Sequence, residues 1–159
     1  MKTTSKTNAL RLAESAGLFI TAYEYDISDN RIDANSIAEK IGRSPQEVFK
    51  TLVTMTPAHE YFVFIVPAAN ELDLKKAAKA AARKSIEMIP LKELLPLTGY
   101  VHGGCSPLGM KKLFPTFINE SAILFDTICV SGGRVGLNIA VNPEKLAEVI
   151  NAEFADITK

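Results

Sequence analysis

The pattern of apolar and polar positions along the chain predicts short helices that alternate with strands. Apolar residues at helical spacing, such as Leu10 and Ala13, predict a helix over 5–16 that stops at Gly17. Runs rich in β-branched and aromatic residues predict strands. The strands are expected over 18–25, 51–56, 61–67, 85–89, 116–119, 127–131 and 135–141, and further helices over 36–42, 70–84, 90–99 and 143–154.

Short connections predict how these strands pair. The turn "TPAHE" joins 51–56 to 61–67 as a hairpin, and "SGGR" (131–134) turns one strand back into the next. Hairpin pairing is antiparallel, and helices stand at both ends and in the middle of the chain. The sequence therefore predicts an α/β fold, with one compact domain over residues 1–159 on a mixed, mostly antiparallel sheet with flanking helices.

A helix start is also predicted just before the strand 51–56. Ser44 is placed as its N-cap, Pro45 as its first residue and Glu47 as the partner in a capping box. This puts Lys50 at a helix-to-strand junction among apolar neighbours. Its ammonium group either reaches water along an apolar stem, or is a fixed cation in a cleft that receives a phosphate or a carbonyl oxygen.

Composition excludes several classes of function. Lys and Arg number 18, as do Asp and Glu, so no global field attracts nucleic acid or a membrane. The two cysteines have no metal-ligand spacing, the N-terminus has no apolar core of signal-peptide length, and no apolar run is long enough to span a bilayer. We therefore expect a soluble cytoplasmic protein with reduced thiols, no metal or cofactor, and neither DNA nor membrane as a partner.

The segment "YVHGGCSPLG" (100–109) is either a tight turn or a ligand-binding loop. Its bare glycine backbone would let a ligand approach closely and would present N–H groups to an oxyanion. Cys105 has no recognisable His and Asp partners, so we expect a small buried residue rather than a nucleophile. His102 is expected inside a strand, in a structural role.

Two further features carry weaker signals. A hairpin alone explains the glycines of "CVSGGRVGLNI" (129–139), in which Ser131 and Asn138 are the polar residues expected to face a pocket. On the predicted helix 70–84, basic residues four positions apart form a stripe. That stripe is either a solvated face or the local positive patch that a neutral protein needs in order to hold a phosphate backbone.

Several of these segments together resemble the YbaK family of aminoacyl-tRNA deacylases, which is related to the editing insertion of bacterial prolyl-tRNA synthetases. The resemblance rests on "TAYEYD", "VFKTLV", "LDLKKAAKA", "TGYVHGGCSPLGMKK", "TFIN" and "VSGGRVGLNI", in this order. It implies a trans-editing enzyme that removes cysteine from mischarged Cys-tRNA(Pro), with Cys-tRNA(Cys) as a second candidate substrate. The family's key lysine corresponds to Lys50, which would hold the 3′-terminal nucleotide of the tRNA.

The resemblance and the local patterns together define the expected site. The expected catalytic residues are Lys50 and Gly104. The residues expected to bind the substrate are Tyr23, Thr51, Gly103, Cys105, Ser106, Pro107, Ser131 and Asn138. The residues expected to contact the tRNA are Lys75, Lys79, Arg83, Lys111 and Lys112.

The chain departs from the family pattern in two places. Asn138 stands where the family commonly has an Asp, and the loop "DISDNRIDAN" (26–35) lacks a phenylalanine often found near the pocket entrance. We expect both changes to affect substrate preference rather than fold. Since the sequence offers no convincing nucleophile, the mechanism implied by the family is attack by the substrate's own thiol on its ester, which releases a cyclic thiolactone.

Two other functions are compatible with the sequence. The protein could edit Ala-tRNA(Pro) with a water molecule as the nucleophile, or it could be a non-catalytic module that binds tRNA or a synthetase. The expected partners are mischarged proline tRNA and, in addition, prolyl-tRNA synthetase.

Overall fold

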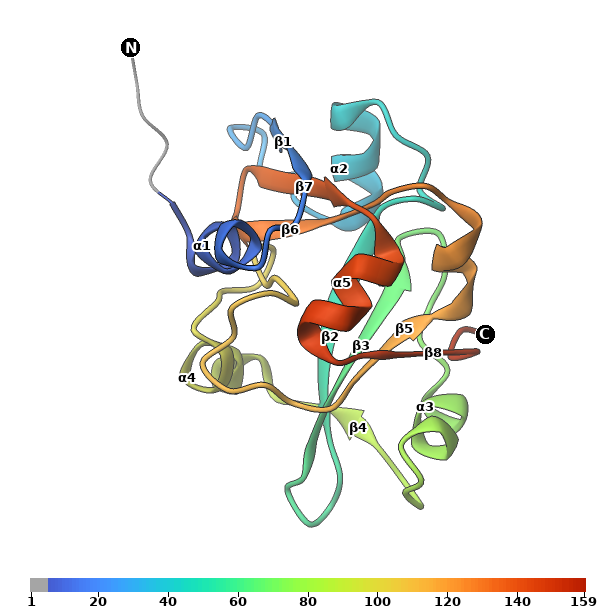
Figure 1. Cartoon of the computed structure of the whole chain (residues 1–159). Helices are drawn as coiled ribbons and strands as arrows, with labels where there is room; N and C mark the ends of the chain where they lie inside the picture. The colour runs from blue at the N-terminus through green and yellow to red at the C-terminus, as the bar shows by residue number, and fades with distance from the viewer. Residues whose placement is uncertain (1–5) are drawn as a thin grey trace.

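The strands divide between two sheets in the computed structural model, which describes residues 6–159 (Figure 1). The smaller sheet is antiparallel, with strand order β1-β7-β6, and the larger is mixed, with order β4-β2-β3-β5-β8. The predicted α/β class and the mostly antiparallel pairing are confirmed, whereas one sheet was expected. The strands are β1 (Ile20–Glu24), β2 (Phe49–Met55), β3 (Tyr61–Pro67), β4 (Glu87–Met88), β5 (Thr116–Asn119), β6 (Ile128–Arg134), β7 (Leu137–Val141) and β8 (Glu153–Ala155).

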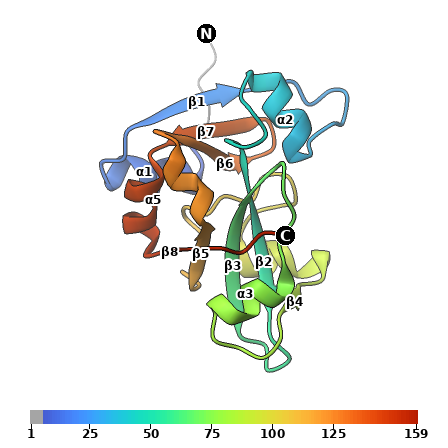
Figure 2. The same cartoon turned by 90° about the vertical axis from the view of Figure 1, so that its right-hand side faces the viewer.

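Helices connect and cover the two sheets (Figures 1 and 2). Thr7 caps the first helix, Asp33 the second, and Asn142 the last, each with its side-chain oxygen on a backbone N–H of the first turn. The helices are α1 (Asn8–Ser15), α2 (Ala34–Ile41), α3 (Leu74–Ala80), η1 (Leu91–Glu93), α4 (Leu94–Thr98), η2 (Glu120–Leu124) and α5 (Pro143–Ile150).

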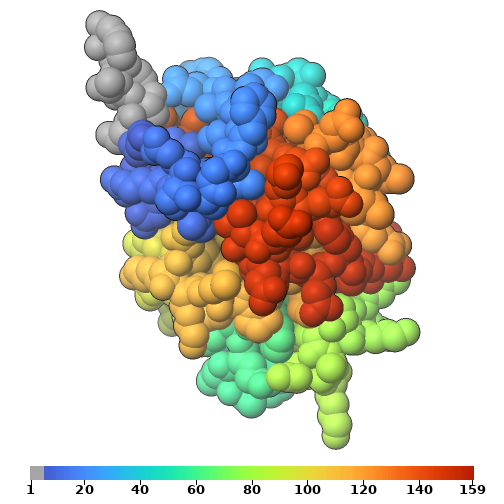
Figure 3. All heavy atoms as spheres, viewed as in Figure 1, coloured from blue at the N-terminus to red at the C-terminus, as the bar shows by residue number. Residues whose placement is uncertain are grey.

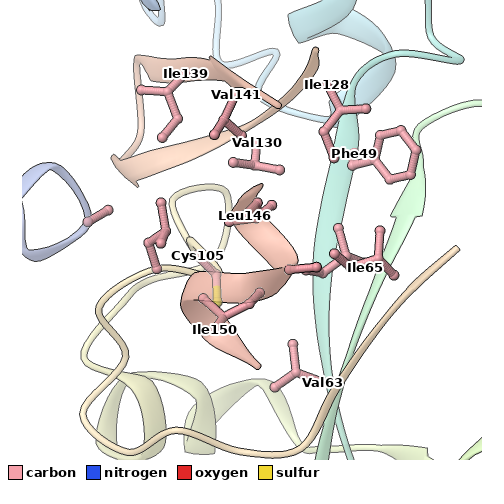
Figure 4. Packing of buried hydrophobic residues seen from close by; sticks show 14 of the residues in the cluster. Phe49, Val63, Ile65, Cys105, Ile128, Val130, Ile139, Val141, Leu146 and Ile150 are labelled. Atoms are coloured by element: carbon pink, nitrogen blue, oxygen red, sulfur yellow. The ribbon is translucent and has the colours of Figure 1, made fainter. Parts of the chain in front are cut away.

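The main core lies where both sheets meet α5 (Figure 4). Side chains of one parity on each strand enter it, because successive residues of a strand point to opposite faces. Its members include Phe49, Val63, Ile65, Val130, Ile139, Val141, Leu146 and Ile150. A second cluster packs α3 on the other face of the larger sheet. A third packs α2 against the smaller sheet and against Val48, the residue before β2.

Local geometry corrects the expected start of β2. The Ser44 amide donates to Glu47 Oε1 at 3.1 Å, as a capping box requires, but the segment makes one turn and no helix. Val48 then forms a parallel bridge with Cys129, and β2 begins at once. Lys50 is therefore the second residue of a strand rather than a residue at a helix end.

Three other element boundaries also differ from the prediction. β6 continues to Arg134 through a bulge, so the hairpin turn lies at 135–136 instead of 131–134. The last helix stops at Ile150, because Asn151 adopts a left-handed conformation with φ of 54°, and β8 follows. Asp73 caps α3, which ends at Ala80, so the helix is shorter than 70–84.

Candidate active site

A pocket of about 280 Å³ opens where the first half of β2 meets the start of α2 and the glycine loop. Of the residues expected to bind substrate or act in catalysis, six line it: Lys50, Thr51, Gly103, Cys105, Ser131 and Asn138. The structure thus gathers residues from four separate segments of the sequence around one cavity.

Lys50 is half-buried in this pocket, and its ammonium group has no acceptor among the described residues. Among residues 6–159, Lys50 Nζ has no hydrogen-bond or ion-pair partner. Lys40 shows the contrast, since its Nζ donates to Asp26 O at 2.6 Å, Asp29 Oδ1 at 2.8 Å and Arg31 O at 2.9 Å. A cation without an acceptor in a partly enclosed cavity is suited to an anionic or carbonyl oxygen of a ligand.

Two buried side-chain oxygens in the described part of the chain lack any hydrogen-bond partner, and both belong to residues of this pocket. They are Thr51 Oγ1 and Asn138 Oδ1, and Asn138 is only 3% exposed. Leaving such a group unsatisfied costs about 1–3 kcal/mol. Thr54, on the same strand, donates instead to Phe62 O at 2.8 Å. Among residues 6–159, the unsatisfied side-chain oxygens thus belong to two residues that line the same pocket.

The glycine loop packs tightly against the turn between β6 and β7. A Cβ on Gly104 would lie 2.9 Å from the backbone atoms Arg134 C and Val135 N, so only glycine fits there. Gly104 does not line the pocket, and its N–H donates to Val101 O at 2.9 Å. This hydrogen bond uses the Gly104 amide within its own turn, and the absence of a Cβ determines how closely the loop packs.

Other amides of the same loop remain available. The N–H groups of Gly103 and Cys105 donate to no acceptor within residues 6–159, and both residues line the pocket. The left-handed φ of Gly103, 86°, produces this turn. Ser106 and Pro107 are buried behind the loop, where Ser106 Oγ accepts from Leu108 N at 3.2 Å, and they do not line the pocket.

The two cysteines are protonated at neutral pH. Burial raises the pKa of the Cys105 thiol to about 12, although the side chain of Thr98 acts in the opposite direction. Burial also raises the pKa of Cys129 to about 11, against the opposing effect of the Arg43 charge. A thiol that stays protonated is a poor nucleophile, so the chemistry of this pocket must use another group.

Several residues of the pocket wall were not expected from the sequence. His102 lies exposed in a turn that lines the cavity, and not in a strand as expected. Ile32 and Asp33 also line it, from the loop that leads into α2, and Asn35 lines it from the first turn of α2. Both carboxylate oxygens of Asp33 accept from Ser36, which lowers the pKa of Asp33. The available signal was the departure from the family pattern, which marked the segment 26–35.

Tyr23 lies outside the cavity. It pairs with Asn138 across the strands β1 and β7, packs with the cluster beneath α2, and its hydroxyl accepts from Arg43 Nη1 at 3.4 Å. Arg43 also bonds Glu47 and Thr127. Tyr23 therefore supports the strand that carries Asn138 and does not itself line the pocket.

The basic residues do not form the expected single stripe. Lys75 and Lys79 are exposed on α3, but Arg83 lies beyond the end of the helix. Arg83 Nε and Nη2 bind the Glu60 carboxylate at 2.8 and 3.0 Å, and its guanidinium lies 5.2 Å from the centroid of the Phe62 ring. Its charge is thus already paired with a carboxylate.

These basic residues are also distant from the start of α2. α3 and α2 lie toward opposite ends of the molecule, as the ribbon views and the space-filling view show (Figures 1, 2 and 3). Lys111 and Lys112, after the glycine loop, are exposed; Lys111 Nζ donates to Pro96 O at 3.3 Å. None of the expected tRNA-contacting residues lines the pocket.

Within residues 6–159, no group of three or more His, Cys, Asp or Glu side chains is placed to hold a metal ion. No helix in the same range is long and apolar enough to cross a membrane.

Comparison with known proteins gives consistent matches. Residues 30–149 match the model of a family described as the aminoacyl-tRNA editing domain. A protein of Enterococcus faecalis (strain ATCC 700802 / V583), provisionally named Cys-tRNA(Pro)/Cys-tRNA(Cys) deacylase EbsC, is 44% identical over 157 residues. That alignment covers 99% of this chain and 96% of that protein.

Solved structures share the fold at lower identity. One, described provisionally as a trans-editing enzyme for prolyl-tRNA synthetase, is 23% identical with a TM-score of 0.83, and the match covers 98% of this chain and 99% of that one. Another, a hypothetical protein, is 20% identical with a TM-score of 0.87, over 96% of this chain and 99% of the other. At these identities the likeness concerns the fold alone.

Proposed function

The chain belongs to the aminoacyl-tRNA editing family, and from that premise we propose that it removes cysteine from Cys-tRNA(Pro) and from Cys-tRNA(Cys). The family relationship predicted from the sequence segments is confirmed, and with it the activity of an aminoacyl-tRNA deacylase. The substrate is our proposal. We also propose that residues 1–159 act as one domain, in the cytoplasm, where tRNA is charged and used.

One observation carries the proposal. A single pocket contains an ammonium group without an acceptor, on Lys50, and two buried oxygens without donors, on Thr51 and Asn138. The 3′ end of a charged tRNA supplies complementary groups: anionic phosphate and ribose oxygens for the lysine, and N–H and O–H donors of the aminoacyl-nucleotide for the two oxygens. A cavity of about 280 Å³ suits a small aminoacyl group.

Each residue then has a distinct role. Lys50 Nζ anchors phosphate or ribose oxygens of the terminal nucleotide. The N–H groups of Gly103 and Cys105, which donate to no acceptor within residues 6–159, would stabilise the negative charge that develops on the ester carbonyl oxygen in the transition state. Asn138 is neutral where the family commonly has a carboxylate, so it orients the aminoacyl group through hydrogen bonds without adding charge.

The reaction needs no nucleophile from the protein. The substrate's thiolate attacks its own ester carbonyl carbon, a carbon–sulfur bond forms, and the carbon–oxygen bond to the ribose breaks. The electron pair of that bond goes to the ribose oxygen, which takes up the proton that the thiol released to solvent. The products are tRNA and a cysteine thiolactone, which water then opens. Holding the thiol near the carbonyl can contribute about 7–11 kcal/mol in favourable geometry.

The test is a deacylation assay with purified protein and a panel of charged tRNAs. We expect rapid loss of the ester from Cys-tRNA(Pro) and Cys-tRNA(Cys), and slow loss from Ala-tRNA(Pro). Faster cleavage of the alanyl ester would establish the water-dependent editor instead, and binding without cleavage would establish a non-catalytic module. Prolyl-tRNA synthetase is the proposed partner, and adding it should raise the rate for Cys-tRNA(Pro) selectively.

A further inference from the structure

The outer edge of β2 has a gap in its backbone pairing at Thr51. On one side of the gap, Val48 forms a bridge with Cys129. On the other side, β4 pairs only with Thr54 and Met55, and Ile89 N donates to Val53 O at 3.3 Å. Within residues 6–159, no strand covers the edge of β2 between these two contacts, and that edge faces the pocket.

The register of the hairpin β2–β3 gives the direction of the Thr51 backbone. Ala68 N donates to Val48 O at 2.7 Å, so this pair is hydrogen-bonded. Because hydrogen-bonded and non-hydrogen-bonded pairs alternate in an antiparallel ladder, the pair of Thr51 with Ile65 is non-hydrogen-bonded. The N–H and C=O of Thr51 therefore point away from β3 and into the gap, in the direction of Val53 O.

Thr51 thus presents unsatisfied groups of two kinds. On this side of β2, no strand within residues 6–159 pairs with Thr51 and no turn or loop group bonds its backbone N–H or C=O, and its Oγ1 is one of the two buried oxygens without a partner. In an antiparallel pair, an outward-pointing residue exchanges both backbone bonds with the one residue opposite. A ligand that carries a nitrogen donor on one carbon and a carbonyl oxygen on the next can make the same two hydrogen bonds to Thr51 as a single strand residue opposite it.

We propose that the aminoacyl group of the substrate fills this gap as one residue of a β-strand, its ammonium donating to Thr51 C=O and its ester carbonyl oxygen accepting from Thr51 N–H. This inference rests on the proposed function. It assigns recognition of the α-amino ester to main-chain groups, which are the same for every side chain. Selection among amino acids is then left to the rest of the pocket and to the substrate's own thiol.

The experiment compares esters that differ only at the α-position. Cys-tRNA(Pro) is cleaved alongside 3-mercaptopropionyl-tRNA(Pro), which keeps the thiol and the ester but lacks the ammonium, and 2-hydroxy-3-mercaptopropionyl-tRNA(Pro), which has a neutral donor. Each enzymatic kcat/KM is divided by the spontaneous rate of the same ester, because the ammonium itself activates an ester. We expect the normalised value to fall about 10- to 100-fold without the ammonium, as for loss of a hydrogen bond to a charged group, and the hydroxy ester to be intermediate.

The Thr51→Val variant distinguishes the backbone from the side chain. It removes Oγ1 and keeps both main-chain groups, so the ratio between the cysteinyl and the 3-mercaptopropionyl ester should stay as in the wild type. A ratio that falls to one in Thr51→Val would assign the ammonium to the hydroxyl and overturn the inference.

Equal normalised rates for all three esters would also overturn it, and the proposed function would stand, because Cys-tRNA(Pro) would still be cleaved. No cleavage of Cys-tRNA(Pro) would refute the proposed function, and the inference with it.

Discussion

Replacing Thr51 by valine should raise the stability of the fold and lower the deacylase activity. The substitution removes Oγ1, a buried oxygen without a partner in the described chain, and keeps the side-chain volume. An unsatisfied buried hydroxyl costs about 1–3 kcal/mol, so we expect the free energy of unfolding to rise by about 1 kcal/mol. For a chain of this size that corresponds to an increase in Tm of about 2–4 °C. Deacylation of Cys-tRNA(Pro) should fall about tenfold, because the ligand loses a hydrogen-bond partner.

Thr54→Val is the matched control on the same strand. Thr54 Oγ1 donates to Phe62 O at 2.8 Å, so its removal should lower the free energy of unfolding by about 1 kcal/mol and leave kcat/KM unchanged. Thermal unfolding and single-turnover deacylation measure both quantities. Effects of opposite sign on stability, with activity lost only in Thr51→Val, identify a functional hydroxyl. If Thr51→Val loses stability and activity together, the reasoning from the orphan oxygen is refuted.

Lys50→Ala should lose most deacylase activity with an unchanged Tm. Lys50→Arg should also be less active, because a planar guanidinium does not replace a point charge. A Tm that falls together with the activity would indicate a structural lysine. The double variant Lys75→Gln with Lys79→Gln should bind tRNA more weakly, and its affinity should depend less on salt concentration. Arg83→Gln breaks the pair with Glu60 and should change mainly the stability of the fold. An unchanged salt dependence of the double variant would exclude α3 from the tRNA interface. Folding raises the pKa of Cys105 to about 12 and of Cys129 to about 11 from the ordinary 9.0, so the folded state binds more protons above about pH 9. The stability that these protonated thiols contribute below pH 9 should therefore be lost as the pH rises toward 11 to 12, by at most about 1.4 kcal/mol per pH unit for each thiol. In Cys105→Ala, the Tm should fall less steeply with pH over this range. An equally steep fall of the Tm would contradict the raised pKa of Cys105.

Local sequence patterns predicted much of the fold, because hairpins and capped helices are encoded by neighbouring residues. The division of strands into two sheets depends on long-range pairing, such as β3 with β5 and β5 with β8, which no local pattern specifies. β8 was missed because the helical pattern over 143–154 continues past Asn151, where a left-handed residue ends the helix.

Part of the candidate site was predictable from polar or charged residues that stand among apolar neighbours in the sequence. Lys50 among apolar neighbours is a costly choice for a core, so a ligand-binding cation was one of its two interpretations, whereas the polar residue Asn138 inside a strand was a weaker signal. The use of the Gly104 amide within its own turn and the pairing of Arg83 with Glu60 were not predictable, because both depend on backbone direction and on contacts distant in sequence.

A single-turnover assay of cysteinyl-tRNA(Pro) and S-methylcysteinyl-tRNA(Pro) with the wild-type protein tests whether the substrate's own thiol is the nucleophile. The methyl group removes the nucleophilic thiol and keeps the ammonium, the ester and nearly the same shape. Since the protein's own thiols are held protonated by burial, we predict that the cysteinyl ester is cleaved rapidly and the S-methyl ester at close to its spontaneous rate. Equally fast cleavage of the two esters would show that an activated water attacks the carbonyl, and would contradict a substrate-assisted deacylase.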